Sequence, residues 1–323
     1  MALTAALDRF QQRHTWAGFP LAVVYKYVDD QGAFLAALIT YYGFLSLFPL
    51  MLLLVTVLGF LLDGDPHLKQ EVLNSALNQF PGLGPQLGSG VTQLRGNTVA
   101  LVVGILGSLY GALGVAQAAQ NALNRVWAVP RNRRPNPLRS RLRSLLFLLV
   151  IGAGLLLTTG LSVLATFAGS FGAHVDLFLR APMLALAVVL NAGLFIVALH
   201  VLTARQVAWR DVLPGAVLAA ITWQILQEAG KYYVAHQVKG STTTYGIFAV
   251  VLGLLAYIYL AAVIVVLCAE VNVVRVERLW PRSLLTPFTD DVELTVADRK
   301  AYTSYPESER HKGFEQVDVR FDK

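Results

Sequence analysis

The sequence predicts an all-α fold: a polytopic transmembrane helix bundle of six spans, with an N-terminal interfacial helix and a short outer-loop helix. Three observations predict it. Of the 323 residues, 55% are hydrophobic and 14% are charged, whereas soluble domains carry about 25% charged residues. Several apolar stretches reach the length of about 20 residues that a helix needs to cross the hydrocarbon core of a bilayer. The basic residues gather between alternate stretches, as they do in membrane proteins.

The segment 1–30 precedes the first apolar stretch and mixes large apolar side chains, among them Phe10, Trp16 and Phe19, with charged ones. This pattern is typical of an amphipathic helix that lies in the membrane interface. The first residues lack a basic segment followed by an apolar one, so we expect no cleaved signal peptide.

The membrane domain is predicted over residues 31–280. Five of its stretches lack Asp, Glu, Lys and Arg, and a sixth, from Val212 to about Val234, carries Glu228 and Lys231 in its second half. An even number of crossings satisfies the charge distribution, so we expect this stretch to span as well; a helix lying on the membrane surface is the alternative. The six predicted spans are about 31–62, 98–122, 144–170, 181–204, 212–234 and 245–272.

The positions of the basic residues predict the orientation. The segment Arg125–Arg143 holds seven arginines and no acidic residue. With the N-terminus inside, fifteen Lys and Arg residues lie in inner segments and five in outer ones, which agrees with the positive-inside rule. We therefore expect both termini in the cytoplasm of a cell that carries this protein in its membrane.

Two segments outside the spans carry separate expectations. In the first outer loop, Asp63–Asn97, the apolar residues of Glu71–Phe80 share one helical face, which predicts a short helix on the outer surface; a mobile loop is the alternative. The C-terminal segment 283–323 has nine acidic and six basic residues and almost no apolar period. It is predicted to be a largely disordered cytoplasmic tail.

Polar residues inside a bilayer are costly and are therefore candidates for function. Four amides recur at helical spacing near the cytoplasmic end of the second predicted span. Glu270 of the last span lies at a similar depth, where Arg125 could neutralise it. These groups form either a polar inner vestibule or interhelical hydrogen bonds that hold the bundle together. The predicted cytoplasmic-side cluster comprises Tyr41, Tyr42, Ser46, Gln117, Gln120, Asn121, Asn124, Arg125, Glu270 and Asn272.

A second polar stripe is predicted in the outer half of the fifth span, where Gln224, Glu228 and Lys231 recur at helical spacing. Glu228 and Lys231 stand three residues apart and are placed to pair. Together with the inner cluster, this stripe would put polar groups near both mouths of a pathway, as alternating access requires. A locally paired charge at the membrane edge is the alternative.

Backbone features predict close or bendable packing of the spans. Pro49 lies inside the first span, where it removes a backbone hydrogen bond and favours a kink. Gly104, Gly107, Gly111 and Gly114 recur along one face of the second span. A row of small residues gives a neighbouring helix a smooth surface to approach.

The sequence offers few of the patterns that enzymes need. Cys268 is the sole cysteine, and no two histidines have the H-x-H or HExxH spacing. No Walker A, GxSxG or GxGxxG motif is present. Asp29 and Asp30 are adjacent acids without a histidine nearby in the sequence. We therefore expect no enzymatic activity, no metal, no cofactor and no nucleic-acid partner.

Four segments carry a resemblance to a known family. They read ALITYYGFLSLFPLMLLL at 37–54, NALNRVWAVPRNRRP at 121–135, DVLPGAVLAAITWQILQEAGKYYV at 211–234 and TYGIFAVVLGLLAYIYLAAVIVVLCAEVN at 244–272. In this order they resemble the YihY/BrkB family of bacterial inner-membrane proteins, except that Cys268 stands where that family usually has glycine. The resemblance covers about residues 15–280. It implies an inner-membrane location and a role in envelope integrity or virulence, and it brings no substrate or catalytic residue.

These features favour a protein that transports or flips a lipid or a small solute, with the polar clusters on its path and the lipid bilayer as its surroundings. A non-transporting scaffold for envelope-assembly partners, acting through its loops and tail, is the alternative. Some members of the resembled family were once labelled ribonuclease BN, and nothing in this chain supports RNA cleavage. A membrane-embedded hydrolase would need a close pairing of acidic residues that the sequence does not display.

Overall fold

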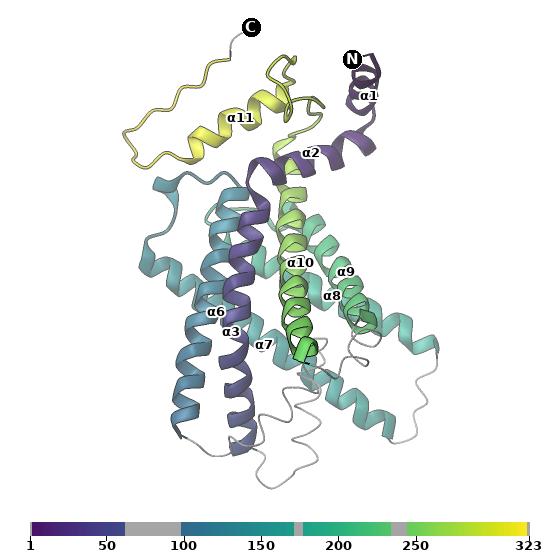
Figure 1. Cartoon of the computed structure of the whole chain (residues 1–323), viewed down its shortest axis with the longest axis vertical. Helices are drawn as coiled ribbons and strands as arrows, with labels where there is room; N and C mark the ends of the chain where they lie inside the picture. Colours follow the sequence, from purple (N-terminus) through teal and green to yellow (C-terminus); the bar gives the residue numbers. More distant parts are fainter. Residues whose placement is uncertain (1, 62–97, 171–176, 234–243, 322–323) are drawn as a thin grey trace.

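The computed structural model describes residues 2–61, 98–170, 177–233 and 244–321. Within these residues the fold is all-helical, as predicted. Helices α3, α6 and α10 run side by side along the long axis, and α1, α2 and α11 lie at the end that carries both termini (Figure 1). The helices are α1 Ala2–Arg13, α2 Thr15–Asp29, α3 Gly32–Leu61, α6 Thr98–Val126, α7 Pro137–Ser170, α8 Leu177–Leu202, α9 Trp209–Tyr233, α10 Thr244–Glu277 and α11 Val296–Ser308, with a short 3-10 helix at Arg131–Arg133.

Four helical segments in the described ranges are long and apolar enough to cross a membrane: Val102–Val126, Ala185–Leu202, Trp209–Gly230 and Val251–Glu277. They fall on the second, fourth, fifth and sixth predicted spans. A shorter apolar segment, Gly32–Leu47, begins the first predicted span. The predicted outer-loop helix at 71–80 lies outside the described residues.

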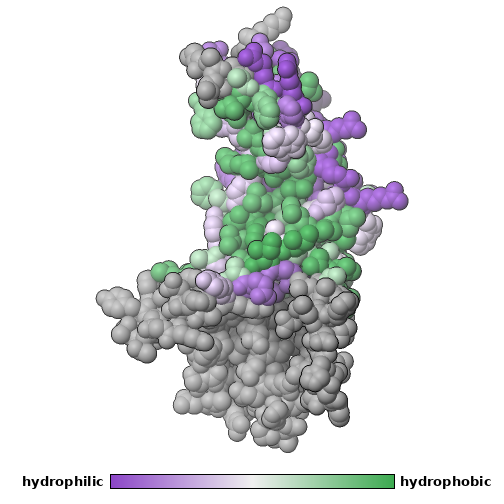
Figure 2. Space-filling view, turned by 90° about the vertical axis from the view of Figure 1, so that its right-hand side faces the viewer, coloured by the Kyte–Doolittle hydropathy of each residue, from purple (hydrophilic) through white to green (hydrophobic). Residues whose placement is uncertain are grey.

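The sides of the bundle expose large apolar side chains. Phe34 is 75% exposed, and Leu106, Leu149, Val189 and Ile225 are exposed as well. Figure 2 shows hydrophobic residues gathered in a broad band, with hydrophilic residues toward the end that carries the termini. Soluble monomers rarely expose so large an apolar surface, whereas hydrocarbon solvates it well.

Helices α3 and α6 pack closely along the predicted glycine face. A Cβ atom added at Gly107 would lie 2.9 Å from the ring of Pro49, one at Gly111 would lie 2.7 Å from the Cα of Ser46, and one at Gly114 would lie 2.2 Å from the ring of Tyr42. Each distance is too short for a real contact, so glycine lets the two backbones approach. The expectation that this face receives a neighbouring helix is confirmed.

Helices α9 and α10 meet at Gly215, where a Cβ atom would lie 2.1 Å from the carbonyl oxygen of Cys268. The side chain of Asn272 accepts a hydrogen bond from the Gly215 amide at 2.7 Å and donates one to the Val212 carbonyl at 3.2 Å. Pro214 lies inside α9 and has no amide hydrogen for the carbonyl four residues earlier. That carbonyl, of Arg210, accepts a hydrogen bond from Arg275 at 3.3 Å instead, and Asn272 joins the same part of α9 to α10.

The predicted disordered tail, 283–323, instead contains an ordered helix, so this expectation was wrong for α11. Thr295 caps the helix: its hydroxyl accepts a hydrogen bond from the Asp298 amide, and the Asp298 carboxylate accepts one from the Thr295 amide. This reciprocal pair is a capping box. Ala297, Asp298 and Ala301 are buried. The helix is held by polar contacts, which a search for apolar periodicity does not detect.

Candidate functional site

A buried cluster of three charged residues lies where α2 meets α10. The ammonium group of Lys26 donates a hydrogen bond to the Asp30 carboxylate, and its Nζ lies 3.7 Å from Oε2 of Glu270. The side chains of Lys26 and Asp30 are each 1% exposed, and that of Glu270 is 0% exposed. We call Lys26, Asp30 and Glu270 the buried triad.

Local structure positions each member of the triad. Lys26 lies in the last turn of α2, on the buried face that also carries Gly18, Ala22 and Val23. Asp30 is the C-cap of this helix, four residues after Lys26, so the two side chains lie on the same side of the chain. The Lys26 ammonium group also donates to the Val126 carbonyl, at the end of α6, at 3.1 Å. Three helices thus converge on one lysine.

The two carboxyl groups of the triad have few hydrogen-bond donors. Three of their four oxygens have no hydrogen-bond partner: both oxygens of Glu270 and Oδ1 of Asp30. Burial raises the pKa of the Asp30 carboxyl, although Lys26 acts in the opposite direction. Burial also acts to lower the pKa of Lys26, but attraction to Glu270 and Asp30 outweighs it, so the net pKa is raised and the ammonium form is favoured. The triad is therefore a cation beside two carboxyl groups, and the anionic form of at least Asp30 is costly.

Arg125 does not take the place that the sequence predicted. Its Nε lies 3.9 Å from Oδ1 of Asp30, and its guanidinium group donates a hydrogen bond to Glu309, just after α11. Arg131 also binds Glu309, at 2.7 Å. Lys26, one of the fifteen basic residues that the sequence analysis counted in the inner segments, is the cation nearest to Glu270. The expected pairing of Arg125 with Glu270 was wrong because α2 folds back over the end of α10.

Three buried amides of the predicted cytoplasmic-side cluster connect helices. Gln120 donates to the Ser144 hydroxyl on α7 at 2.8 Å, and Asn124 accepts from the Ala204 amide after α8 at 2.9 Å. Asn272 holds α9, as described above. These contacts are interhelical or helix-to-loop hydrogen bonds, the second of the two interpretations that the sequence left open.

Five other members of that cluster are exposed or contact groups outside the buried triad. Gln117 and Asn121 are exposed, and the Asn121 side chain accepts a hydrogen bond from Arg134 at 3.2 Å. Tyr41 is exposed, Tyr42 packs against Gly114, and Ser46 donates to the carbonyl of Gly43 in its own helix. None of the contacts described for these five residues involves Glu270.

The predicted outer-side stripe lies on α9. Gln224 is half-buried and Glu228 is exposed. The backbone of Lys231 belongs to the same helix, whereas its side chain lies outside the described residues. The expected pairing of Glu228 with Lys231 remains a prediction.

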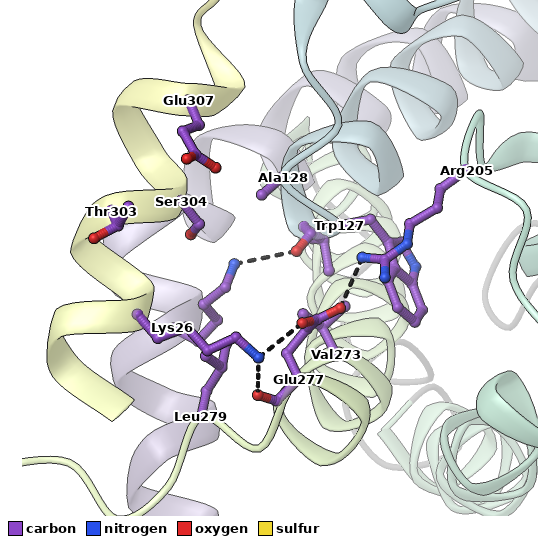
Figure 3. A pocket seen from close by; sticks show the side chains of 12 residues that line it. Lys26, Trp127, Ala128, Arg205, Val273, Glu277, Leu279, Thr303, Ser304 and Glu307 are labelled. Carbon is purple, nitrogen blue, oxygen red and sulfur yellow. Dashed lines mark hydrogen bonds and ion pairs between the residues drawn. The ribbon is translucent and has the colours of Figure 1, made fainter. Parts of the chain in front are cut away.

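A cavity of about 380 Å³ separates α11 from the helix bundle next to the triad. We call it the tail pocket. Lys26, Glu277, Lys300 and Ser304 line it, and Figure 3 shows Ser304 and Glu307 of α11 on the side opposite Trp127. Glu277 binds Arg205 at 2.8 Å and Lys300 at 3.0 Å. Lys26 therefore lines this pocket together with polar residues of α10 and α11.

Arg282 and Asp298 anchor the tail to the rest of the protein. Arg282 is 1% exposed and pairs with Asp298, which is fully buried. The guanidinium group also lies 3.1 Å from Asp29, and the hydroxyl of Tyr305 donates to the same carboxylate at 2.9 Å. The Ser283 amide donates to Asp298 at 2.9 Å. The two adjacent acids therefore have different partners: Asp29 holds the tail, and Asp30 belongs to the buried triad.

Replacing Asp298 by alanine is expected to release α11. The change removes the capping box and leaves the buried Arg282 without its shortest contact, and breaking a buried ion pair costs about 3–5 kcal/mol. Trypsin should then cut at Arg299 and Lys300 faster than in the unchanged protein. Asp318→Ala is the control, because the Asp318 side chain is 73% exposed. Equal cleavage rates in both variants would mean that Asp298 does not hold the tail.

Sequence reasoning missed Lys26 and Asp30 as members of the site. Lys26 was assigned to orientation, and Asp30 was noted only as one of two adjacent acids. The available signal was their spacing of four residues just before the first span, which favours pairing on a helix. The convergence of this pair with Glu270 depends on contacts 240 or more residues apart in the chain.

A family model described as Virulence factor BrkB matches residues 23–287. This chain belongs to that family. The matched range contains the whole buried triad and Arg282, and it ends before α11 begins. The resemblance drawn from the four sequence motifs is confirmed.

Several BrkB relatives align with most of the chain. The protein YfkH of Bacillus subtilis (strain 168), which is named ribonuclease-like, is 26% identical over 266 residues, covering 78% of this chain and 93% of its own. An uncharacterized protein of Dickeya dadantii (strain 3937) is 30% identical over 261 residues, covering 76% of this chain and 79% of its own. No solved structure matches the chain.

A third relative carries a membrane label in its name. The UPF0761 membrane protein Mpe_A1422 of Methylibium petroleiphilum (strain ATCC BAA-1232 / LMG 22953 / PM1) is 31% identical over 202 residues, which cover 61% of this chain and 44% of that protein. Together with the apolar helices α6, α8, α9 and α10, the family match identifies the chain as a multi-pass membrane protein of the BrkB family. Within the described residues, no group of three or more His, Cys, Asp or Glu side chains is arranged to hold a metal ion.

Proposed function

We propose that this BrkB-family protein has six spans, with both termini in the cytoplasm, and supports envelope integrity in the inner membrane by transporting or flipping a lipid or a small solute. In this proposal, α3 and α7 cross the membrane in addition to the four segments described above. Helices α3 and α7 contain 30 and 34 residues, and about 20 residues suffice to cross the hydrocarbon core.

The positions of the arginines support the proposed orientation. Arg131, Arg133 and Arg134 lie between α6 and α7, and three more arginines lie in the first turns of α7. Basic residues near the ends of spans favour the cytoplasmic side. The N-terminal helices and α11 lie at this same end of the bundle (Figure 1). The buried triad then lies at the cytoplasmic ends of the spans.

The buried triad is the observation that carries the transport proposal. Ionisable side chains in a membrane protein are expensive to bury and are commonly kept for a substrate path or an ion relay. Neutral amides are sufficient to hydrogen-bond neighbouring helices to each other, as those of Gln120 and Asn272 do in this protein. A cation with two carboxyl groups, three of whose oxygens lack hydrogen bonds, exceeds what packing requires.

Liposomes that contain the purified protein test this proposal. We expect them to take up solute or to scramble fluorescent lipid, and Glu270→Ala should abolish most of this activity. Glu228→Ala should reduce it if the outer-side stripe lies on the same path. Asp318→Ala is the exposed control. Unchanged activity in Glu270→Ala, or liposomes without any activity against a broad set of lipids and solutes, would contradict the proposal.

The alternative is a scaffold for envelope-assembly partners, and the ordered tail is the observation that favours it. Helix α11 is held in a fixed place by Asp29, Arg125 and Arg282, as a docking element would be. Neutralising Arg131, Arg133 and Arg134, or deleting the tail, should remove a scaffold's function while a transporter keeps its activity in liposomes. We also propose that the chain is not an enzyme, so the purified protein should not cleave RNA.

A further inference from the structure

We propose that Asp30 and Glu270 form a proton-binding site, in which the two carboxyl groups together hold one proton at neutral pH and Lys26 balances the charge that remains. A role of this site in energy coupling rests on the proposed transport function. The binding of a proton rests on the geometry of the buried triad alone.

The balance of charge is the first argument. Two fully ionised carboxylates would face one lysine in a place where all three side chains are at most 1% exposed. Arg125 makes no hydrogen bond to Asp30 and is engaged by Glu309. An unpaired buried carboxylate is so unfavourable that such a group usually takes up a proton. One shared proton leaves a single negative charge beside the single positive charge of Lys26.

The hydrogen bonds give the second argument. Oδ1 of Asp30 and both oxygens of Glu270 are buried acceptors without a donor. A carboxylate only accepts hydrogen bonds, but a protonated carboxyl group also donates one. Both carboxyl groups lie beside the same Lys26 ammonium group, which donates a hydrogen bond to Asp30 and lies 3.7 Å from Oε2 of Glu270. A proton held by the pair therefore supplies a hydrogen-bond donor among three acceptor oxygens that otherwise have none.

The surrounding groups do not replace this proton. Helix α2 brings Lys26, Asp29 and Tyr27 toward the pair, α6 brings Arg125, and α11 places the ring of Tyr305 at 5.6 Å from the Lys26 ammonium group. The sequence of α3 contains no charged residue. The same Lys26 ammonium group lies beside both carboxyl groups and lines the tail pocket. Lys26 is thus the member of the buried triad that reaches the pocket.

Infrared spectroscopy of the protein in lipid nanodiscs tests the site without any substrate. A protonated carboxyl group has a carbonyl stretch that an ionised one lacks, and this band shifts in D₂O. The unchanged protein at neutral pH is expected to show such a band. Glu270→Gln and Asp30→Asn should each lose it, because the remaining acid can ionise beside Lys26. Asp318→Asn, at an exposed position, should keep it.

The absence of the band from the unchanged protein would overturn the proposal, and this result does not depend on whether any variant folds. Persistence of the band in either Glu270→Gln or Asp30→Asn would overturn it as well. Liposome assays separate this failure from a failure of transport. If the unchanged protein shows the band but no transport, the proton site stands and the proposed function is contradicted. If it shows transport but no band, only the proton site is contradicted.

Discussion

Replacing Lys26 by methionine is expected to destabilise the protein by about 3–5 kcal/mol, because it leaves buried carboxyl groups without their cation. Methionine keeps a long apolar side chain, so little packing is lost. Lys26 is 1% exposed and binds the Val126 carbonyl as well as Asp30, so its removal acts on three helices at once. The free energy of unfolding by SDS in mixed micelles measures the effect.

The loss should depend on pH in a definite direction. Without Lys26, the pKa of Asp30 rises further above its ordinary value, and a carboxyl group with a raised pKa contributes stability that is lost as pH rises. The variant should therefore be closest to the unchanged protein near about pH 5 and furthest from it near about pH 8. Lys312→Met, at an exposed position, is the control. A Lys26→Met variant no less stable than this control would show that the lysine is not buried among acids.

Replacing Gly215 by leucine is expected to prevent α9 and α10 from packing. The new Cβ would lie 2.1 Å from the carbonyl oxygen of Cys268 and 2.4 Å from Nδ2 of Asn272. The Cys268 oxygen is part of a helix backbone and cannot move aside like a side chain. Overpacking of a core costs about 1–3 kcal/mol and sometimes more, and we expect the upper end because a whole side chain is added. The yield of monodisperse protein in detergent, measured by size-exclusion chromatography, should fall sharply.

Gly193→Leu is the matched control for this experiment. A Cβ at Gly193 would meet no atom within 4 Å, and the residue lies in α8, within one of the membrane-crossing segments. The control should extract like the unchanged protein, because leucine at a lipid-facing position replaces no contact. If the Gly215 variant extracted equally well, the close approach of α9 and α10 would be wrong.

The helices could largely be predicted because their signal is local. Each apolar stretch that marks α6, α8, α9 or α10 is contiguous in the sequence. The bounds of the helices differ from those of the predicted spans by a few residues at most of their ends. The glycine face of α6 was also predictable, since small residues recur at helical spacing. Glu270 was identified as a site residue for the same reason: it is an acid inside an apolar stretch.

The partners of Glu270 could not be predicted because they come from far away in the chain. Lys26 and Asp30 precede the first span, in a segment that any sequence pattern assigns to the membrane surface. Their burial arises only when α2 folds over the ends of α6 and α10. The helix α11 was missed for a related reason. Its order depends on Arg282 and Asp29, which are 16 and 269 residues away from Asp298 along the chain.

Arg125 connects the tail to the edge of the buried triad. Arg125 lies between Asp30 and Glu309, so one guanidinium group faces the buried site on one side and the tail on the other. Burial acts to raise the pKa of Glu309, but its hydrogen bonds and attraction to Arg131 and Arg125 lower it overall. Glu309 therefore remains a carboxylate and keeps the tail over the site at neutral pH.

A double-mutant cycle between Lys26 and Glu270 tests most directly whether the buried triad acts as one unit. The free energy of unfolding would be measured for Lys26→Met, for Glu270→Gln and for the two together. We expect the double variant to be more stable than the sum of the single effects by at least about 1 kcal/mol, because residues in one charged network are coupled. Effects that add within about 0.3–0.5 kcal/mol, as those of distant residues do, would contradict the account.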